Sequence, residues 1–191
     1  ISILDDPEAK KYIDGSAFHL YGGQIDALSE VHRAHPDKNI YFTEQWIGAP
    51  GDLAGDLRWH VKNLIIGAPR NWAKTVLEWN LSSAPDLKPH TDRGGCDQCL
   101  GAITIKINHV LRNPAYYVIA HASKFVSPGS VRIDSNEPEG LPNVAFTRPD
   151  GKQVLIVLND GQAQQTFAVK NNKWVGAVTL SAGAVATIVF D

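Results

Sequence analysis

Hydrophobic positions in the first two thirds of the chain follow two periods in alternation. Stretches rich in β-branched and aromatic residues, such as "AFHLY" and "IYFTE", predict strands. Stretches with apolar residues three or four positions apart predict helices, and Leu53, Leu57 and Val61 fall on one such face. The pattern predicts strands at 15–21, 38–44 and 74–80, helices at 5–14, 24–36, 52–69 and 113–126, and a loop over 81–102.

The spacing of the predicted elements changes from about Val131, where short strands are divided by turn signals such as Asp150–Gly151. Spacing of this kind is typical of an antiparallel sandwich. The strands are predicted at 130–135, 143–149, 153–160, 165–171, 173–180 and 184–191. Helices alternating with strands, followed by strands alone, indicate a parallel α/β unit over 1–127 and a β-sandwich over 128–191.

Composition narrows the class of protein. The 191 residues carry a formal net charge of −2, which argues against a general nucleic-acid binder. No apolar run approaches the ~20 residues of a membrane span, so we expect no transmembrane segment. The chain begins at Ile1 and contains no Met. We therefore expect a processed or excised piece of a longer protein, in which a missing signal peptide is uninformative.

Cys96 and Cys99 stand in "GGCDQCLG" and are the two cysteines of the chain. A single CxxC is compatible with a redox pair, with half of a zinc site that borrows His90 or His109, or with a small disulfide loop. A redox motif of the thioredoxin type opens a helix after a strand, whereas this one follows a loop with Gly and Pro. We interpret it as a local closure of that loop.

The three predicted parallel strands end in polar and aromatic residues. In parallel α/β architectures the carboxyl ends of the strands converge on the active site. Trp and Tyr stack on sugar rings, and a retaining glycosidase uses one carboxylate as nucleophile and a second as acid and base. We predict Glu44 as the nucleophile. The predicted substrate-binding residues are His19, Tyr21, Trp46, Glu78, Trp79 and Asn80.

Each of these residues also has a structural interpretation. Glu44 could pair with an arginine at a strand end, and His19 could be a half-buried histidine with satisfied hydrogen bonds. Glu78 fits an orienting role better than direct catalysis. The aromatic side chains, Trp46 among them, could simply cover the core. The functional interpretation depends on the coincidence of three strand ends.

Several stretches resemble a known family: "DPEAKKYIDGSAFHLYGG", "YFTEQWIG", "VLEWNL" and "YYVIAHASKFVSPGSVRI" are similar to the second half of glycoside hydrolase family 30. That family includes lysosomal glucosylceramidases and bacterial β-1,6-glucanases. The resemblance implies strands six to eight of a (β/α)8 barrel joined to a β-sandwich side domain, with a retaining double displacement. It matches Glu44 to the nucleophile and Glu78, Trp79 and Asn80 to the end of strand eight. Leu20 stands where the family often has Trp.

The family's acid/base Glu follows an Asn at the end of strand four, a strand that this sequence does not contain. The chain's own "NEP", Asn136–Pro138, lies between predicted sandwich strands, and we interpret it as a turn. Glu78 is an alternative acid, because adjacent strands lie ~4.8 Å apart and retaining carboxylates ~5–5.5 Å apart. The resemblance assigns that role elsewhere, so we expect the chain to be inactive alone.

The expected function is that of a retaining β-glycosidase acting on a β-glucoside or β-glucan, with the missing N-terminal barrel half as partner. This mechanism requires no metal ion and no cofactor. The resemblance implies a secreted or periplasmic location. One alternative is a non-catalytic carbohydrate-binding sandwich, although Trp174, Phe146, Phe167 and Phe190 follow apolar alternations expected in a core. The other is a CxxC redox or metal protein.

Overall fold

The computed structural model describes residues 1–171 and 174–191, and the chain divides into two compact units. The first unit consists of Ile1–Gly51 and Gly67–Tyr116. The second consists of Asp52–Ile66 and Tyr117–Asp191. None of the helices in the described ranges is long and apolar enough to cross a membrane.

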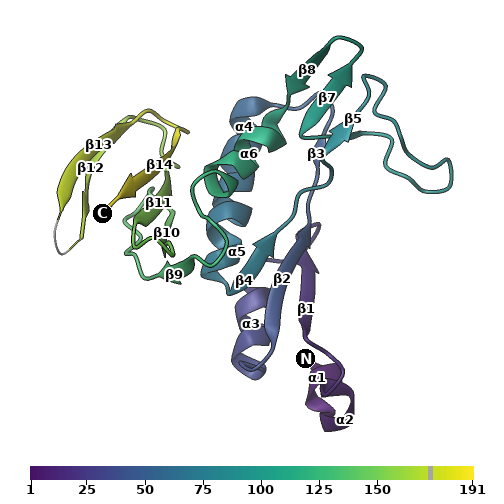
Figure 1. The fold of residues 1–191 in the computed structure, drawn as a ribbon, viewed down its shortest axis with the longest axis horizontal. Coiled ribbons are helices and arrows are strands. Elements are labelled where there is room, and N and C mark those ends of the chain that lie inside the picture. The colour runs from purple at the N-terminus through teal and green to yellow at the C-terminus, as the bar shows by residue number, and fades with distance from the viewer. Residues whose placement is uncertain (172–173) are drawn as a thin grey trace. The chain divides into compact units, whose positions relative to one another are not determined.

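A parallel three-stranded sheet forms the centre of the first unit, in the order β1–β2–β4 (Figure 1). Ile40 and Phe42 alternate along the middle strand and are buried, which explains why this run of strand formers pairs on both sides. The strands are β1 (Gly15–His19), β2 (Asn39–Glu44) and β4 (Ala73–Val76).

Short helices precede and follow β1. Asp6 caps α2, because its carboxylate accepts hydrogen bonds from the backbone N–H groups of Glu8 (2.8 Å) and Ala9 (3.3 Å), and Pro7 occupies the first turn. Leu28 of α3 is buried, as the predicted helical face requires. These helices are α1 (Ser2–Asp5), α2 (Pro7–Lys10) and α3 (Ala27–Ala34).

Two of the three strands end earlier than their sequences predict. β1 ends at His19, so Tyr21 lies beyond the strand, and β4 ends at Val76, so the segment 78–80 lies beyond it as well. The chain nevertheless stays aligned with β2: the Trp79 N–H donates to the Gln45 carbonyl oxygen at 2.7 Å. The side chains predicted at these strand ends therefore keep their place next to Glu44.

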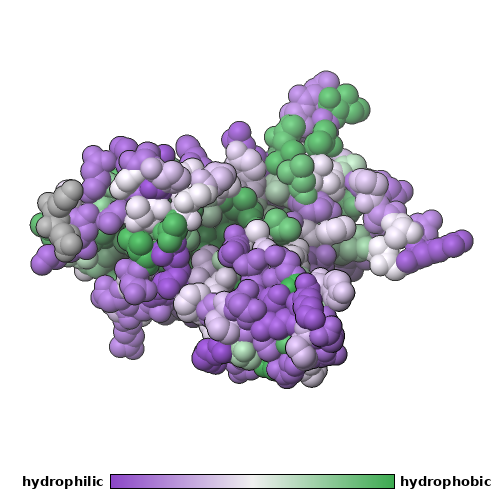
Figure 2. All heavy atoms as spheres, turned by 60° about the horizontal axis from the view of Figure 1, so that its bottom comes forward, coloured by the Kyte–Doolittle hydropathy of each residue, from purple (hydrophilic) through white to green (hydrophobic). Residues whose placement is uncertain are grey.

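The segment after β4 is more ordered than a loop. β5 (Ser82–Ser83) pairs with β7 (Ile103–Lys106), and β7 forms an antiparallel hairpin with β8 (His109–Arg112). β6 (Cys99–Leu100) pairs with β3 (Ile47–Gly48). The predicted loop over 81–102 is thus wrong at both of its ends. The hairpin carries several exposed apolar side chains and stands out as a green projection in Figure 2.

The helix predicted over 52–69 is present in three consecutive parts. α4 (Leu53–His60) continues into a π-helical turn, η1 (Val61–Ile66), and then into α5 (Gly67–Arg70). Asp52 caps α4 through the N–H groups of Ala54 and Gly55. The last predicted helix is α6 (Pro114–Ser123).

All six strands predicted for the sandwich are present in the second unit. Four form an antiparallel sheet in the order β14–β11–β10–β9, and two form the separate pair β12–β13. The first residue of the strand predicted over 173–180, Lys173, lies outside the described residues. The strands are β9 (Val131–Ile133), β10 (Asn143–Thr147), β11 (Gln153–Leu158), β12 (Gln165–Lys170), β13 (Val175–Leu180) and β14 (Val185–Phe190).

The two central strands of this sheet hold most of the buried apolar side chains of the sandwich. Val144, Val154, Ile156 and Leu158 are fully buried. The prediction that Trp174 lies in the core is wrong, because 39% of it is exposed. Its indole ring instead stacks on the ring of Phe190, with 5.4 Å between the centroids.

Candidate active site

Glu44 is the last residue of β2, where the buried alternation of that strand ends. The register between β1 and β2 shifts between Phe18 and His19, so that His19 lies opposite Glu44. Such an irregularity in a ladder re-aims the side chains beside it. The effect here is to bring the side chains of two neighbouring strand ends together.

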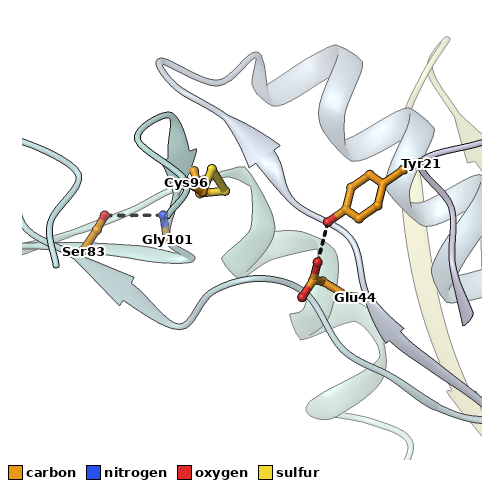
Figure 3. The surroundings of a disulfide bond; sticks show 6 residues. Tyr21, Glu44, Ser83, Cys96 and Gly101 are labelled. Atoms are coloured by element: carbon orange, nitrogen blue, oxygen red, sulfur yellow. Dashed lines mark hydrogen bonds between the residues drawn. A yellow bond between two sulfur atoms is a disulfide. The ribbon is translucent and has the colours of Figure 1, made fainter. Parts of the chain in front are cut away.

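Tyr21 and His19 both contact the Glu44 carboxylate. The Tyr21 hydroxyl donates a hydrogen bond to Glu44 Oε1 at 3.0 Å, as Figure 3 shows. His19 Nδ1 lies 3.7 Å from the same oxygen. The rings of His19 and Tyr21 meet edge to face, with 5.7 Å between their centroids. Glu44 therefore has a donor and an imidazole at one oxygen, in the arrangement predicted from the sequence.

The Tyr21 hydroxyl stays protonated over a wide pH range. Burial raises the pKa of Tyr21 well above its ordinary value of 10.0, and the hydrogen bond to Glu44 and the charges of Glu44 and Glu78 raise it further. A phenol beside two carboxylates keeps its proton because ionisation would add a third negative charge. Tyr21 is thus a permanent hydrogen-bond donor to Glu44.

Two tryptophans flank this group. Trp46 and Trp79 form an isolated parallel bridge, which extends the pairing of β2 beyond its end. Trp79 is 48% exposed, so its ring face can receive a ligand. Asn80 follows, and its Oδ1 is buried without a hydrogen-bond partner among the described residues. A side chain at Gly101 would begin 2.8 Å from that oxygen, so glycine leaves room for Asn80.

These residues line a cleft of about 650 Å³. Five predicted site residues contribute to it: Tyr21, Glu44, Trp46, Trp79 and Asn80. The remaining lining residues come from the segment that follows β5 and ends at the first residue of β6: Pro89, His90, Thr91, Gly94, Gly95, Cys96 and Cys99. A volume of this size lies within the range of ~300–1,000 Å³ that is typical of small-molecule sites.

Cys96 and Cys99 form a disulfide, which confirms the interpretation of the CxxC as a loop closure. Cys99 pairs with Gly48 in the β3–β6 ladder, and the Ala49 N–H donates to the Gln98 carbonyl oxygen at 2.9 Å. The cleft loop is therefore fixed to the chain just beyond Trp46. In the view of Figure 3 the disulfide lies to the left and the Tyr21–Glu44 pair to the right.

Two predicted site residues do not line the cleft. His19 is not among the lining residues, and it contacts two of them, Tyr21 and Glu44. Glu78 has a buried carboxylate oxygen, Oε2, and acts on the site through the effect of its charge on Tyr21. This placement agrees better with an orienting role for Glu78 than with direct contact to a ligand.

The contacts of Glu44 do not support its interpretation as a strand-end charge paired with an arginine. Within residues 1–171 and 174–191 no arginine pairs with Glu44, whose contacts are Tyr21 and His19. The family resemblance predicts that the loop with "KPHTDRGGCDQCLG" borders the cleft, and Pro89, His90 and Thr91 of this loop line it. The sequence did not single out any of the three as a ligand-binding residue, and it suggested His90 only as a metal ligand. The CxxC closes the same loop next to Trp46.

Known proteins resemble the chain along most of its length. The endo-1,6-beta-D-glucanase neg1 of Aspergillus fumigatus is 31% identical over 181 residues, which are 88% of this chain and 36% of that protein. The lysosomal acid glucosylceramidase of Mus musculus is 29% identical over 174 residues, 82% of this chain and 33% of that protein. The chain thus spans about a third of the length of these curated relatives.

A solved structure, that of an endo-beta1,6-glucanase, superposes with a TM-score of 0.89 at 32% identity over 97% of this chain and 43% of that chain. The sequence pattern of the glycosyl hydrolase family 30 TIM-barrel domain matches residues 1–126. The pattern of the family 30 beta sandwich domain matches residues 129–188. The chain is therefore a member of glycosyl hydrolase family 30, with the C-terminal part of the barrel followed by the sandwich.

Proposed function

We propose that residues 1–191 are the C-terminal part of a retaining β-glycosidase that hydrolyses β-glucosidic bonds with Glu44 as nucleophile. The observation that carries the proposal is the Glu44 carboxylate at the end of β2, held by Tyr21 and next to His19 in a cleft flanked by two tryptophans. Curated relatives named as β-1,6-glucanases and glucosylceramidases support a β-glucoside or β-glucan substrate.

In the first step a Glu44 oxygen attacks the anomeric carbon, and the bond from that carbon to the leaving-group oxygen breaks. The leaving oxygen takes a proton from a general acid, which leaves a glycosyl ester on Glu44. In the second step water displaces the ester while the same acid, now a base, takes the proton of the water. Neither step requires a metal ion or a cofactor.

Tyr21 orients the nucleophile in this scheme. It donates to Glu44 Oε1 and keeps its proton, so it holds the carboxylate in one orientation without neutralising it. Trp79 offers exposed aromatic surface for a sugar, and Asn80 lines the cleft next to it. The charge of Glu78 raises the pKa of Tyr21 further and so supports its protonated state.

The general acid belongs, in this proposal, to the N-terminal barrel half, because the described carboxylates offer no second cleft-lining group beside Glu44. Asn136–Pro138 lies between β9 and β10 of the sandwich, as the turn interpretation requires. A disulfide fits an oxidising compartment, which supports a secreted or periplasmic enzyme.

The test uses the full-length enzyme and an aryl β-glucoside. Replacing Glu44 by Gln lowers kcat by at least ~10⁴-fold, because the enzyme then lacks the carboxylate that forms the glycosyl ester. In the Glu44→Ala variant azide enters the vacated space and restores turnover, with an α-glucosyl azide as product. Glu30→Gln, at an exposed position of α3, is the matched control and keeps full activity.

Two outcomes would contradict the nucleophile role. The first is near-normal turnover by Glu44→Gln. The second is azide rescue that yields a β-glucosyl azide, since that product requires another nucleophile on the enzyme.

A further inference from the structure

The loop between β5 and β6 supplies the second wall of the cleft. His90 lies in this wall and is half-buried, and its imidazole is able to form hydrogen bonds. The other cleft-lining residues of this loop are Pro89, Thr91, two glycines and the disulfide cysteines. Large aliphatic side chains are missing from the described lining of this wall. It presents the Pro89 ring and the disulfide to a ligand, together with backbone, a hydroxyl and the His90 imidazole.

The wall is held in place by several independent contacts. Its far end is pinned by the Cys96–Cys99 disulfide and by the pairing of Cys99 with Gly48. Nearer to His90, the Thr91 carbonyl oxygen accepts from the Gly95 N–H at 3.2 Å, and Thr91 Oγ1 accepts from the Arg93 N–H at 3.2 Å. His90 therefore directly precedes a turn that these hydrogen bonds hold in one conformation.

The hydrogen-bonding groups of the cleft differ in how they are already used. The Tyr21 hydroxyl donates to Glu44, and Thr91 Oγ1 is taken by Arg93. Over residues 1–171 and 174–191, no hydrogen bond or ion pair engages the imidazole of His90. A neutral imidazole offers one donor and one acceptor. His90 can therefore bind a ligand hydroxyl without breaking an existing contact.

We propose that His90 binds a hydroxyl of the sugar next to the glucose ring attacked by Glu44, and so makes the cleft selective for β-linked gluco-oligosaccharides over glucosides with an apolar aglycone. The inference rests on the proposed function. Glu44, Tyr21, Trp79 and Asn80 at the strand ends surround the reacting ring, whereas His90 belongs to the other wall. A site that hydrogen-bonds a substrate hydroxyl discriminates against analogues that lack it.

The test compares three substrates of the full-length enzyme: β-1,6-linked gluco-oligosaccharides, an aryl β-glucoside and a glucosylceramide in detergent. Replacing His90 by Ala lowers kcat/KM for the oligosaccharides by about 3- to 10-fold, the effect of one lost hydrogen bond, mostly through KM. The aryl glucoside, which lacks the second sugar, changes by less than about 2-fold. His90→Asn, which keeps a donor and an acceptor, restores part of the loss.

The control is His109→Ala, an exposed histidine of β8 that does not line the cleft, and it leaves all three rates unchanged. An equal loss on all substrates in His90→Ala would overturn the proposal, because it indicates a structural role. Unchanged oligosaccharide kinetics in His90→Ala would overturn it too, as would an unaltered enzyme that prefers the glucosylceramide. A failure of the proposed function is distinguished by the Glu44→Gln variant. That variant stays active only if Glu44 is not the nucleophile, whatever the result for His90.

Discussion

Two carboxylates stand where a buried strand ends, one in each unit, and their surroundings are opposite. Asp160 follows β11, and its two carboxylate oxygens accept from Arg58 Nε and Lys62 Nζ, each at 2.6 Å. Glu44 ends β2, and among the described residues its partners are the Tyr21 hydroxyl and His19 rather than a lysine or an arginine. The side chain of Asp160 is 18% exposed and that of Glu44 33%.

The contrast extends to the residue beside each carboxylate. Asn159 is fully buried, and its Nδ2 donates to the carbonyl oxygens of Ala163, Leu180 and Ser181. Its Oδ1 accepts from Gly161 N and Gln165 Nε2, both at 3.0 Å. Near Glu44, by comparison, Asn80 leaves Oδ1 without a partner among the described residues. The Asn159 side chain is thus saturated by hydrogen bonds within the fold, whereas the contacts of the Glu44 carboxylate with the described residues all fall on Oε1.

The largest expected effect on stability is that of Asn159→Ala. It removes the partner of several buried groups at once, so the free energy of unfolding falls by about 3–4 kcal/mol. A urea titration of the full-length enzyme measures this loss. Asn108→Ala, at an exposed turn between β7 and β8, is the control and stays within ~0.5 kcal/mol.

The contrast between the stabilising polar groups of the second unit and Glu44 is contradicted if Glu44→Gln destabilises the protein as much as Asn159→Ala does. Glu44 would then be a structural charge. We expect Glu44→Gln to change the free energy of unfolding by less than ~0.5 kcal/mol.

Tyr21→Phe tests the donor that replaces a cation at Glu44. Losing a hydrogen bond to a charged group lowers kcat by about 10- to 100-fold. Because the pKa of Tyr21 is raised above 10.0, its hydroxyl is protonated throughout the range from about pH 4 to pH 9, and the variant keeps the shape of the pH–rate profile. Tyr12→Phe, at an exposed position, is the control. A lost alkaline limb in Tyr21→Phe would show that Tyr21 titrates during catalysis, against this account.

Asp160→Asn is expected to cost less than Asn159→Ala, about 2 kcal/mol in the free energy of unfolding at neutral pH. Burial alone raises the pKa of Asp160, but the hydrogen bonds and charges of Lys62 and Arg58 outweigh it and hold the pKa below 3.8. The stabilisation is therefore present above pH 3.8 and is lost as the pH falls through the lowered pKa.

Urea titrations at neutral pH and near pH 3 measure this change, and the difference between Asp160→Asn and the unaltered enzyme narrows at the lower pH. Asp150→Asn, which loses only a more exposed pair with Arg148, costs ~0.5 kcal/mol. A difference of equal size at both pH values would contradict the role of the ion pairs.

Much of the fold is predicted by the spacing of apolar residues along the chain. The alternation of apolar and polar residues identified all six sandwich strands and the parallel sheet, and it is clearest in β2, β10 and β11, which hold buried side chains. The same reasoning failed for η1, since Val61, Leu64 and Ile65 present an apolar face in either an α- or a π-helical turn. It also assigned no element to 103–112, where the apolar side chains of the β7–β8 hairpin are largely exposed.

The site was predicted in part for the same reason. Glu44, Tyr21 and Trp79 follow from strand ends that the sequence marks, and they line one cleft. The family resemblance also places the loop of His90 beside the cleft, but it does not single out His90, whose position depends on a turn closed by the disulfide and by the pairing of β6 with β3. Glu78 was predicted at the right strand end, but only side-chain packing decides that it faces away from the cleft lining.

The most direct test of the account is covalent trapping of the full-length enzyme with a 2-deoxy-2-fluoro β-glucoside that carries a good leaving group. The fluorine slows the second displacement, so the glycosyl ester accumulates. Peptide mass spectrometry is expected to find one 2-fluoroglucosyl group on Glu44, within residues 40–48. A label on Glu78 or on any other carboxylate, or an enzyme inactivated without a label on Glu44, would contradict it.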